Sequence, residues 1–508
     1  MAVVIFDGLV LSEEQRECIE KAKALPIGGE LLIEAGAGAS KTFTLKALAK
    51  LVMVNRRGMY LAYNNEIVKE VKSMFPTSTD VLTTHGLAHR YVGRYFALRL
   101  KANMTLRMFV NIFNVHAIGH YGVNKIAKLA MQSVCKFCIS DDDTLGVKHV
   151  KTVCASAPQL VDVVLFYAKR YWIELNNYQS SMPVFHDAYL KIFALKLKCK
   201  ELIISLDYLM MDECQDTAPV VKQIYDLIVS PIKIAVGDRF QAIYLWRGAI
   251  DSMNQFSQEH VASLTTCYRF GDEIASLANK TILATHDERP CFKGNPDKHS
   301  VIHLTPFDVD IDSQFIISRT NADLYQSMMT SFELGRKPKP LKSADVSINL
   351  LNDIKGLKTK GKAVSFELAA FESYSELKEQ VNNGLNSDMK SLIAAVEQYG
   401  VDDLLTRFNE MTETRYQAND ILTTAHSSKG MEANNVVLSQ DFDYCINPNT
   451  SNLKEEGSLL YVALTRVKSN LDVSRCSTIK KILSDTFNQK MERKSSVKRD
   501  RFLQLFGN

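Results

Sequence analysis

The sequence predicts an α/β protein built as two halves, each interrupted by a mainly helical insertion. Short apolar runs that end in polar residues alternate with helical periodicity, a pattern typical of parallel sheets covered by helices. Two stretches, residues 96–200 and 336–418, interrupt this alternation. The chain has 508 residues, and a single hydrophobic core stops growing at about 250 to 300 residues. We therefore expect more than one domain.

The composition is that of an ordinary globular protein, with 46% hydrophobic and 23% charged residues. The net charge of +4 is too small to indicate a nucleic-acid partner by itself, so such contacts would come from a local groove. Ten scattered cysteines argue against a disulfide framework. The sequence shows no bilayer-spanning segment, no signal-peptide pattern and hence no membrane partner. We expect an intracellular protein, cytoplasmic in a prokaryote or phage-infected cell and nuclear in a eukaryote.

A P-loop is predicted at residues 31–42, where an apolar run precedes a turn of small residues and a helix that opens with Lys-Thr. Lys41 would reach the β and γ phosphates of ATP, and the hydroxyl of Thr42 would bind Mg²⁺. The fit departs from the common pattern at Ser40, where glycine is usual. The turn whose backbone N–H groups would surround the phosphates is formed by Ala35, Gly36, Ala37, Gly38, Ala39 and Ser40.

Acidic residues follow a second apolar strand at residues 208–211. Asp212 is placed to hold the water shell of Mg²⁺, and Glu213 to polarise an attacking water.

Other strand ends carry polar and aromatic residues, which we expect near the ligand because strand ends of a parallel sheet face the binding crevice. Tyr63 and Asn64 end one such strand, and His85 follows the next. After the strand at 232–237, aromatics are interleaved with a cation at Tyr244, Trp246 and Arg247. This pattern suits single-stranded nucleic acid, because bases stack on aromatics whatever their sequence. Packing into the core is the alternative for Tyr63 and Trp246.

Several segments leave alternatives open. Ser12 and Gln15 form a predicted capping box, although the Gln15 amide could instead contact adenine. Cys135 and Cys138, with His149 and Cys154 downstream, are either buried thiols or a zinc site. Residues 335–340 are predicted to form a linker, and the basic run 355–362 a solvated loop or a phosphate contact.

The C-terminal tail is predicted to be a basic, flexible arm at residues 490–501 that ends in the apolar tip 502–506. An apolar tip on such a tether either folds back on the protein or docks on a partner, such as a recombinase or a sliding clamp.

Taken in order, these segments resemble superfamily 1 DNA helicases of the UvrD/Rep kind. The resemblance rests on Asp-Glu-Cys-Gln-Asp at 212–216, Gly-Asp-x-x-Gln-x-Ile-Tyr-x-Trp-Arg-Gly-Ala at 237–249 and Tyr-Val-Ala-Leu-Thr-Arg at 461–466. Residues 186–191 and 216–219 are similar to the helicase part of the F-box DNA helicases. Because Gln15 lies so near residue 1, we expect no F-box ahead of it.

The resemblance implies two RecA-like domains, with ATP in the cleft between them. They comprise residues 1–95 with 201–262 and residues 263–335 with 419–485, and the insertions 96–200 and 336–418 and the tail 486–508 complete the chain. It also implies residue roles. Gln15 and Tyr268 would contact adenine, Glu432 the ribose, and Lys41, Gln241, Arg269 and Arg466 the γ-phosphate. Single-stranded DNA would be contacted by Tyr63, Asn64, His85, Tyr244, Trp246, Arg247, Asn321 and His426.

The expected activity is ATP-driven movement along single-stranded DNA and unwinding at single/double-strand junctions. The resemblance implies 3′ to 5′ travel. Arg466 would act as an arginine finger, with a surface ion pair as its alternative. Phe43 stands where the family often has arginine. Two other functions stay open, namely a translocase that strips proteins from DNA and a nucleotide-gated DNA-binding protein with weak turnover.

Overall fold

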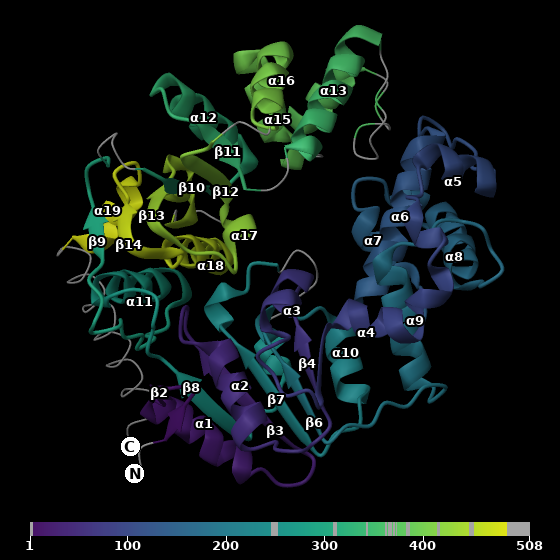
Figure 1. Ribbon diagram of the computed structural model, residues 1–508. Coiled ribbons are helices and arrows are strands. Elements are labelled where there is room, and N and C mark those ends of the chain that lie inside the picture. Colours follow the sequence, from purple (N-terminus) through teal and green to yellow (C-terminus); the bar gives the residue numbers. More distant parts are fainter. Residues whose placement is uncertain are drawn as a thin grey trace, which may run out of the picture. The chain divides into compact units, whose positions relative to one another are not determined.

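The computed structural model divides into two units, coloured by sequence in Figure 1. Unit 1 comprises residues 1–35, 40–264 and 356–374, and unit 2 comprises residues 36–39, 265–355 and 375–508. The structure describes residues 4–244, 252–307, 312–341, 344–360, 363, 368, 371, 373–382, 387–413, 417–446 and 452–484.

Unit 1 is organised around a six-stranded sheet in the order β5-β4-β6-β7-β3-β8, and every adjacent pair is parallel. Helices cover both faces of such a sheet, which explains why its central strands read as continuous apolar runs. Leu31, Leu32 and Ile33 of β3 are all fully buried. The strands are β3 (Gly29–Ala35), β4 (Gly58–Ala62), β5 (Thr79–Thr83), β6 (Tyr208–Met211), β7 (Ile232–Gly237) and β8 (His260–Leu264).

Of the helices around this sheet, α1 begins after Ser12 and α2 begins at Lys41, as the sequence suggests. A short hairpin of β1 (Ile5–Phe6) and β2 (Leu9–Val10) precedes the first of them, α1. Ser12 accepts a hydrogen bond from Gln15 N, and the Gln15 side chain accepts one from Ser12 N, so the predicted capping box is confirmed. These helices are α1 (Glu13–Lys23), α2 (Lys41–Leu51), α3 (Asn65–Val71), α4 (Thr84–Tyr91) and α10 (Pro219–Leu227).

The first insertion is helical, as predicted, and shares its core with the sheet. One hydrophobic cluster runs from Leu61 of β4 through Leu87 of α4 to Phe137 and Phe193 of the insertion. The insertion is therefore packed onto unit 1 by a continuous apolar interior. Its helices are α5 (Leu106–Phe113), α6 (Val123–Ile139), α7 (Val147–Val153), α8 (Val161–Asn176) and α9 (His186–Lys198).

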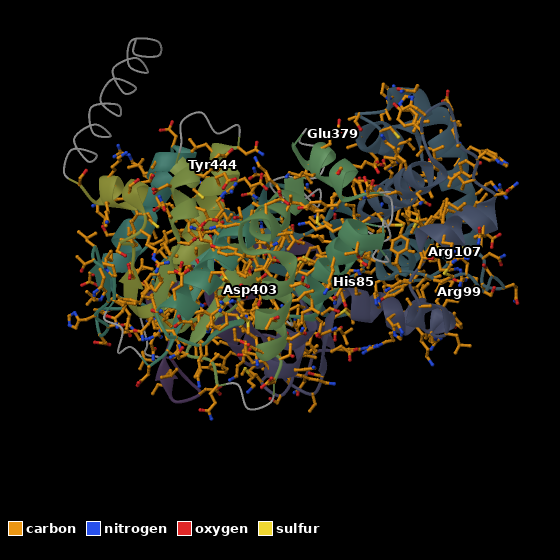
Figure 2. The ribbon with its side chains drawn as sticks, turned by 90° about the horizontal axis from the view of Figure 1, so that it is seen from above. His85, Arg99, Arg107, Glu379, Asp403 and Tyr444 are labelled. Carbon is orange, nitrogen blue, oxygen red and sulfur yellow. The ribbon has the colours of Figure 1, made fainter. Side chains whose placement is uncertain are left out.

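A buried arginine closes the end of α8. Arg99, labelled in Figure 2, donates to the carbonyls of Met182 at 2.6 Å, Asn177 at 2.7 Å and Glu174 at 3.0 Å. The last carbonyls of a helix lack partners within the helix and carry partial negative charge, so a cation is favourable there.

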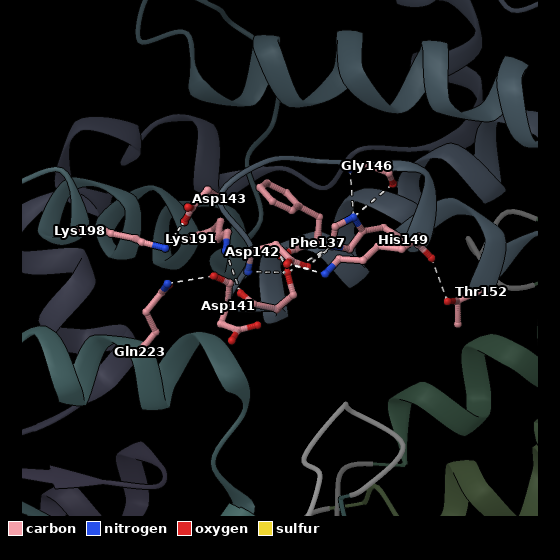
Figure 3. A network of polar contacts seen from close by, with 12 residues as sticks. Phe137, Asp141, Asp142, Asp143, Gly146, His149, Thr152, Lys191, Lys198 and Gln223 are labelled. Carbon is pink, nitrogen blue, oxygen red and sulfur yellow. Dashed lines mark hydrogen bonds and ion pairs between the residues drawn. The ribbon is translucent and has the colours of Figure 1, made fainter. Parts of the chain in front are cut away.

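A polar network fixes the loop between α6 and α7 (Figure 3). The buried Lys191 ammonium donates to the Ser140 carbonyl at 2.8 Å and lies 4.8 Å from the Phe137 ring centre. Burial lowers the pKa of Lys191 to about 8. His149 lies 2.9 Å from the Asp142 carboxylate, and Gln223 of α10 donates to the loop carbonyl of residue 141. The loop is thus tied to both the insertion and the covering helices of the sheet.

Unit 2 contains a second parallel sheet, in the order β11-β12-β10-β13-β14-β9. The predicted linker at 335–340 is wrong in part, because Pro338–Pro340 forms the edge strand β11, which pairs with β12. Proline lacks an N–H, which is tolerated on an edge strand. The other strands are β9 (Val301–His303), β10 (Gln314–Ser318), β12 (Asp420–Thr424), β13 (Ala433–Leu438) and β14 (Val467–Asp472).

Helices surround this sheet and form most of the second insertion. For the basic run 355–362, the solvated-loop alternative is wrong, because residues up to Lys360 belong to α13; the phosphate contact stays a prediction, and residues 361–362 lie outside the described residues. The insertion contains α13 (Asp345–Lys360), α14 (Tyr374–Asn382), α15 (Ser387–Tyr399) and α16 (Val401–Glu410). The helices next to the sheet are α11 (Asp272–His286), α12 (Asn321–Glu333), α17 (Ala425–Ser428), α18 (Leu453–Leu464) and α19 (Ser477–Leu483). No helix in the described ranges is both long and apolar enough to cross a membrane.

Candidate nucleotide and nucleic-acid site

The predicted P-loop lies between the end of β3 at Ala35 and the start of α2 at Lys41. Ser40 precedes that helix with φ 58° and ψ 41°, a left-handed conformation that glycine adopts without steric cost. Its carbonyl accepts bonds from the Thr44 amide at 3.0 Å and the Thr44 hydroxyl at 3.1 Å. Ser40 therefore holds the backbone shape for which glycine is the usual residue, at a conformational cost of about 1 to 2 kcal/mol.

Lys41 and Thr42 meet the two acidic residues that follow β6. The Lys41 ammonium lies 3.1 Å from the Glu213 carboxylate, and the Thr42 hydroxyl donates to Asp212 Oδ2 at 3.2 Å. Burial alone would lower the pKa of Lys41, but the carboxylates of Glu213, Asp238 and Asp212 raise it above its ordinary value. Lys41 is therefore a cation, and its ammonium can exchange a carboxylate partner for a phosphate.

The Asp212 carboxyl has a raised pKa, because it is buried and lies beside the charge of Glu213. Its oxygen and the Thr42 hydroxyl form a pair of hard oxygen donors, which is the ligand type that Mg²⁺ prefers. These residues fit the predicted Mg²⁺ site. Among the described residues, no group of three or more His, Cys, Asp or Glu side chains could hold a metal ion, so the zinc alternative at Cys135 and Cys138 has no support.

Tyr60 is a contributor to this site that sequence reasoning missed. It lies fully buried in β4, and its hydroxyl donates to Asp212 Oδ2 at 2.6 Å. Burial and the Asp212 charge raise the pKa of Tyr60 well above its usual value, so it stays a donor. A tyrosine in the middle of the apolar run Met59–Ala62 was the only signal in the sequence that could have pointed to it.

A relay of amides and carboxylates connects Glu213 with the next strand end. Gln215 donates to Glu213 Oε2, and its own carbonyl oxygen accepts from Asp238 N at 3.0 Å. Asp238 Oδ2 accepts in turn from the Gln241 side chain at 2.7 Å. Glu213 itself has φ 52°, a second non-glycine residue in the left-handed region. Strained backbone of this kind tends to occur at functional sites.

Among the described residues of unit 1, those predicted to face DNA, namely Tyr63, Asn64, His85 and Tyr244, line one cavity of about 950 Å³. The rings of Tyr63 and Tyr244 lie stacked across 5.9 Å with an interplanar angle of 22°. His85 Nε2 lies 2.8 Å from Asp187 Oδ1, so α9 of the insertion contributes to the same wall. Asp212 and Glu213 line this cavity too. The structure thus brings the acidic residues and the aromatic pair to one space within unit 1.

The remaining residues predicted to contact DNA are placed as follows. Asn64 caps α3 by accepting from Ile67 N at 2.9 Å. Asn321 is the first residue of α12, and His426 lies in α17. Trp246 and Arg247 lie outside the described residues, as does the predicted C-terminal arm.

In unit 2 the residues predicted to contact the nucleotide gather around Arg269. Its guanidinium donates to Glu432 Oε2 at 2.8 Å and to the carbonyl of Thr465 at 2.8 Å. Burial alone would raise the pKa of Glu432, but Lys468 and Arg269 hold it below its usual value. Tyr268 is 37% exposed beside this group.

Arg466 is buried with 2% exposure, and its Nε donates to the carbonyl of Val462 at 2.8 Å. The surface ion pair considered as its alternative is therefore wrong. The guanidinium stabilises the end of α18 in this structure, where helix carbonyls lack intrahelical partners.

The two parallel sheets and the P-loop residues define the chain as a P-loop NTPase with two RecA-like domains. Comparison with known proteins adds matches to helicase domains. Residues 198–261 match the UvrD/REP helicase N-terminal domain, and residues 367–478 match the UvrD-like helicase C-terminal domain. Both matches are to UvrD-like helicase domains, as the sequence motifs predicted.

Similar proteins include F-box DNA helicase protein 1 of Schizosaccharomyces pombe, which is 27% identical over 91% of this chain and 57% of its own length. F-box DNA helicase 1 of Gallus gallus is 23% identical over 87% of this chain and 47% of its own length. The chain is homologous to these helicases over most of its length, and it spans about half of theirs.

Proposed function

We propose that this protein is an ATP-dependent translocase on single-stranded DNA and a DNA helicase with 3′ to 5′ polarity, acting in DNA replication, recombination or repair. The observation that carries the proposal is the cavity of about 950 Å³ lined both by Asp212 and Glu213 and by Tyr63, His85 and Tyr244. Residues suited to ATP hydrolysis and residues suited to base stacking share one space. The matches to UvrD-like helicase domains support the same activity.

In the proposed reaction, Lys41 exchanges its Glu213 partner for the β and γ phosphates of ATP. This exchange frees Glu213 to orient a water and accept its proton. Thr42 and Asp212 would hold Mg²⁺, which supplies charge neutralisation at the phosphates when it is bound. Tyr60 would keep the Asp212 carboxylate oriented through its hydrogen bond of 2.6 Å.

Unit 2 and the remaining residues would complete recognition of the same nucleotide, as the helicase resemblance implies. Gln241, Arg269 and Arg466 would contact the γ-phosphate. Gln15 and Tyr268 would contact adenine, and Glu432 would contact the ribose. For Arg466 this role requires its guanidinium to leave the Val462 carbonyl, which it contacts in this structure.

The DNA would pass along the aromatic residues of unit 1. A DNA base can stack on the rings of Tyr63 and Tyr244 whatever its identity, and a motor that steps along any sequence requires this. Hydrogen bonds through Gln215 and Asp238 connect Glu213 with Gln241. Tyr244 follows Gln241 by three residues. A base at the tyrosine pair would therefore contact a segment of the chain that is connected to the hydrolytic residues.

Release of phosphate from ATP, measured with and without single-stranded DNA, tests the proposal. We expect strong stimulation by DNA and unwinding of forks that carry a 3′ single-stranded tail. Hydrolysis that does not respond to DNA would contradict it. A preference for 5′ tails would contradict the polarity alone.

A translocase that strips recombinase or other proteins from DNA is the second candidate, which the small second insertion at residues 336–418 leaves open. Clearing of a recombinase filament at a rate well above fork unwinding would favour it. The third candidate, a DNA-binding protein with weak turnover, rested on Ser40. Ser40 takes the left-handed backbone conformation usual for glycine, with φ 58°, and the ATPase measurement above separates this candidate from the two motor functions.

A further inference from the structure

An exposed tyrosine stands at the strand ends of the second sheet. Tyr444 lies in a short helical segment, Gln440–Ile446, that follows β13, and it is 49% exposed (Figure 2). Its ring lies over the guanidinium of Arg319, at 4.4 Å from the ring centre. Arg319 follows β10, which pairs in parallel with β13. Tyr444 is therefore at the carboxyl edge of neighbouring parallel strands, where ligands of α/β sheets bind.

The arginine beneath the ring is held in place. Arg319 makes two hydrogen bonds to the Glu456 carboxylate, of which the Nε to Oε2 contact is 2.6 Å. Its side chain is 21% exposed and that of Glu456 is 14% exposed. A bidentate pair with this degree of burial fixes the guanidinium plane. The ring of Tyr444 thus rests on a rigid support.

The backbone around this support is fixed as well. Asp441 accepts from Arg319 N at 2.9 Å, from Thr320 N at 2.8 Å and from the Thr320 hydroxyl at 2.9 Å. Asn321, predicted to contact DNA, is the next residue and begins α12. The tyrosine segment and the start of α12 are consequently joined through one carboxylate.

We propose that Tyr444 is a stacking platform for a base of single-stranded DNA in unit 2. The inference rests on the proposed DNA translocase function and adds a contact residue that the helicase motifs do not contain. A base is favoured over a phosphate because the charge of Arg319 is already neutralised by Glu456, and Asp441 and Asp443 lie nearby in the sequence. Stacking on an aromatic needs no positive charge and tolerates any base.

The chain offers a matched control for the test. Tyr95 of the first insertion is 59% exposed and also lies over an arginine, with the Arg94 guanidinium 4.9 Å from its ring centre. Its short helical segment, Gly93–Phe96, follows the helix α4, whereas that of Tyr444 follows the strand β13. Tyr95→Ala therefore removes the same type of exposed side chain from a place that lacks the proposed function.

The experiment measures the affinity of the full chain for an oligo-dT single strand by fluorescence anisotropy. We expect Tyr444→Ala to weaken binding about 5- to 100-fold, because one stacked base is lost. Tyr444→Phe and Tyr95→Ala should bind within about 2-fold of the wild type, and all variants should keep the wild-type melting temperature. Wild-type affinity of Tyr444→Ala would overturn the inference while leaving the proposed function in place.

A second strand, with the same phosphates but abasic sugars throughout, separates stacking from charge. On this strand Tyr444→Ala and the wild type should bind equally, because no base is present to stack. An equal loss on both strands would overturn the stacking inference. If the wild type binds neither strand, the proposed DNA function fails together with it.

Discussion

Replacing Tyr60 by phenylalanine tests the organisation of the acidic site. The substitution keeps the buried ring and removes only the hydroxyl that donates to Asp212 Oδ2 at 2.6 Å. Asp212 is 5% exposed, so water cannot readily replace the lost donor. A hydrogen bond to a charged group is worth about 1.5 to 3 kcal/mol. We expect Tyr60→Phe to lower the free energy of unfolding by that amount near neutral pH.

Tyr208→Phe is the matched control. Tyr208 is fully buried in β6, the strand next to β4, and its hydroxyl is paired with the neutral hydroxyl of Thr79. A bond between neutral groups contributes only about 0.5 to 1.5 kcal/mol. Urea unfolding followed by circular dichroism should therefore rank the two variants, with Tyr60→Phe the less stable.

The pH dependence of stability and of ATP hydrolysis provides a second test of the hydrogen bond between Tyr60 and Asp212. Burial and the Glu213 charge raise the pKa of Asp212, while the Tyr60 hydrogen bond opposes them. A carboxyl whose pKa is raised in the folded state favours folding at pH below its ordinary value of 3.8, and this contribution is lost as the pH rises through the folded pKa. Tyr60→Phe removes the opposing bond and raises the pKa of Asp212 further.

The proposed metal contact needs the ionised Asp212 carboxylate. In Tyr60→Phe, the acid limb of the pH–rate profile for ATP hydrolysis should therefore move to higher pH. Tyr208→Phe should leave the limb in place. Equal stability losses in the two variants, together with an unmoved acid limb, would refute the reasoning.

Three further predictions concern the two units. Lys41→Ala and Glu213→Gln should both abolish ATP hydrolysis, but only Glu213→Gln should still bind ATP in a nucleotide titration; hydrolysis by Glu213→Gln at the wild-type rate would show that another group acts on the water. Arg466→Ala should lower turnover by roughly 10³ to 10⁵ while changing ATP affinity far less, whereas equal losses in both would make Arg466 a binding residue. A methyl group added at Gly237 would lie 2.6 Å from the side-chain oxygen of Gln215, so Gly237→Ala should cost about 1 to 3 kcal/mol of unfolding free energy; an unchanged urea transition would mean that Gln215 moves without cost.

Much of the fold could be predicted because its signals are local. The P-loop was recognised from an apolar run, a small-residue turn and a Lys-Thr helix start, and the structure places β3 and α2 there. The capping box at Ser12 likewise needs only two residues three apart. Signals of this kind are contained within a few consecutive positions.

What the sequence could not reveal depends on neighbours that are distant in the chain. Tyr60 meets Asp212 only because β4 pairs with β6, and strand order is not encoded in either strand alone. The edge strand at Pro338–Pro340 contains two prolines and is a strand only because β12 accepts it as a neighbour. Arg466 is charged, yet it is buried because the carbonyls of Val462 and Met431 and the hydroxyl of Thr465 accept from its guanidinium.

In the proposed function, one set of residues in unit 1 serves both DNA and nucleotide. Asp238 receives Gln241 at 2.7 Å and is held by Gln215, which also contacts Glu213. Tyr244 follows Gln241 by three residues and stacks on Tyr63. In the proposed function, a base that enters between the tyrosines would move the segment that carries Gln241, and the hydrogen bonds through Asp238 and Gln215 would pass this movement to Glu213. Such a relay is short and mostly buried, so its partners cannot shift independently without leaving a polar group unsatisfied.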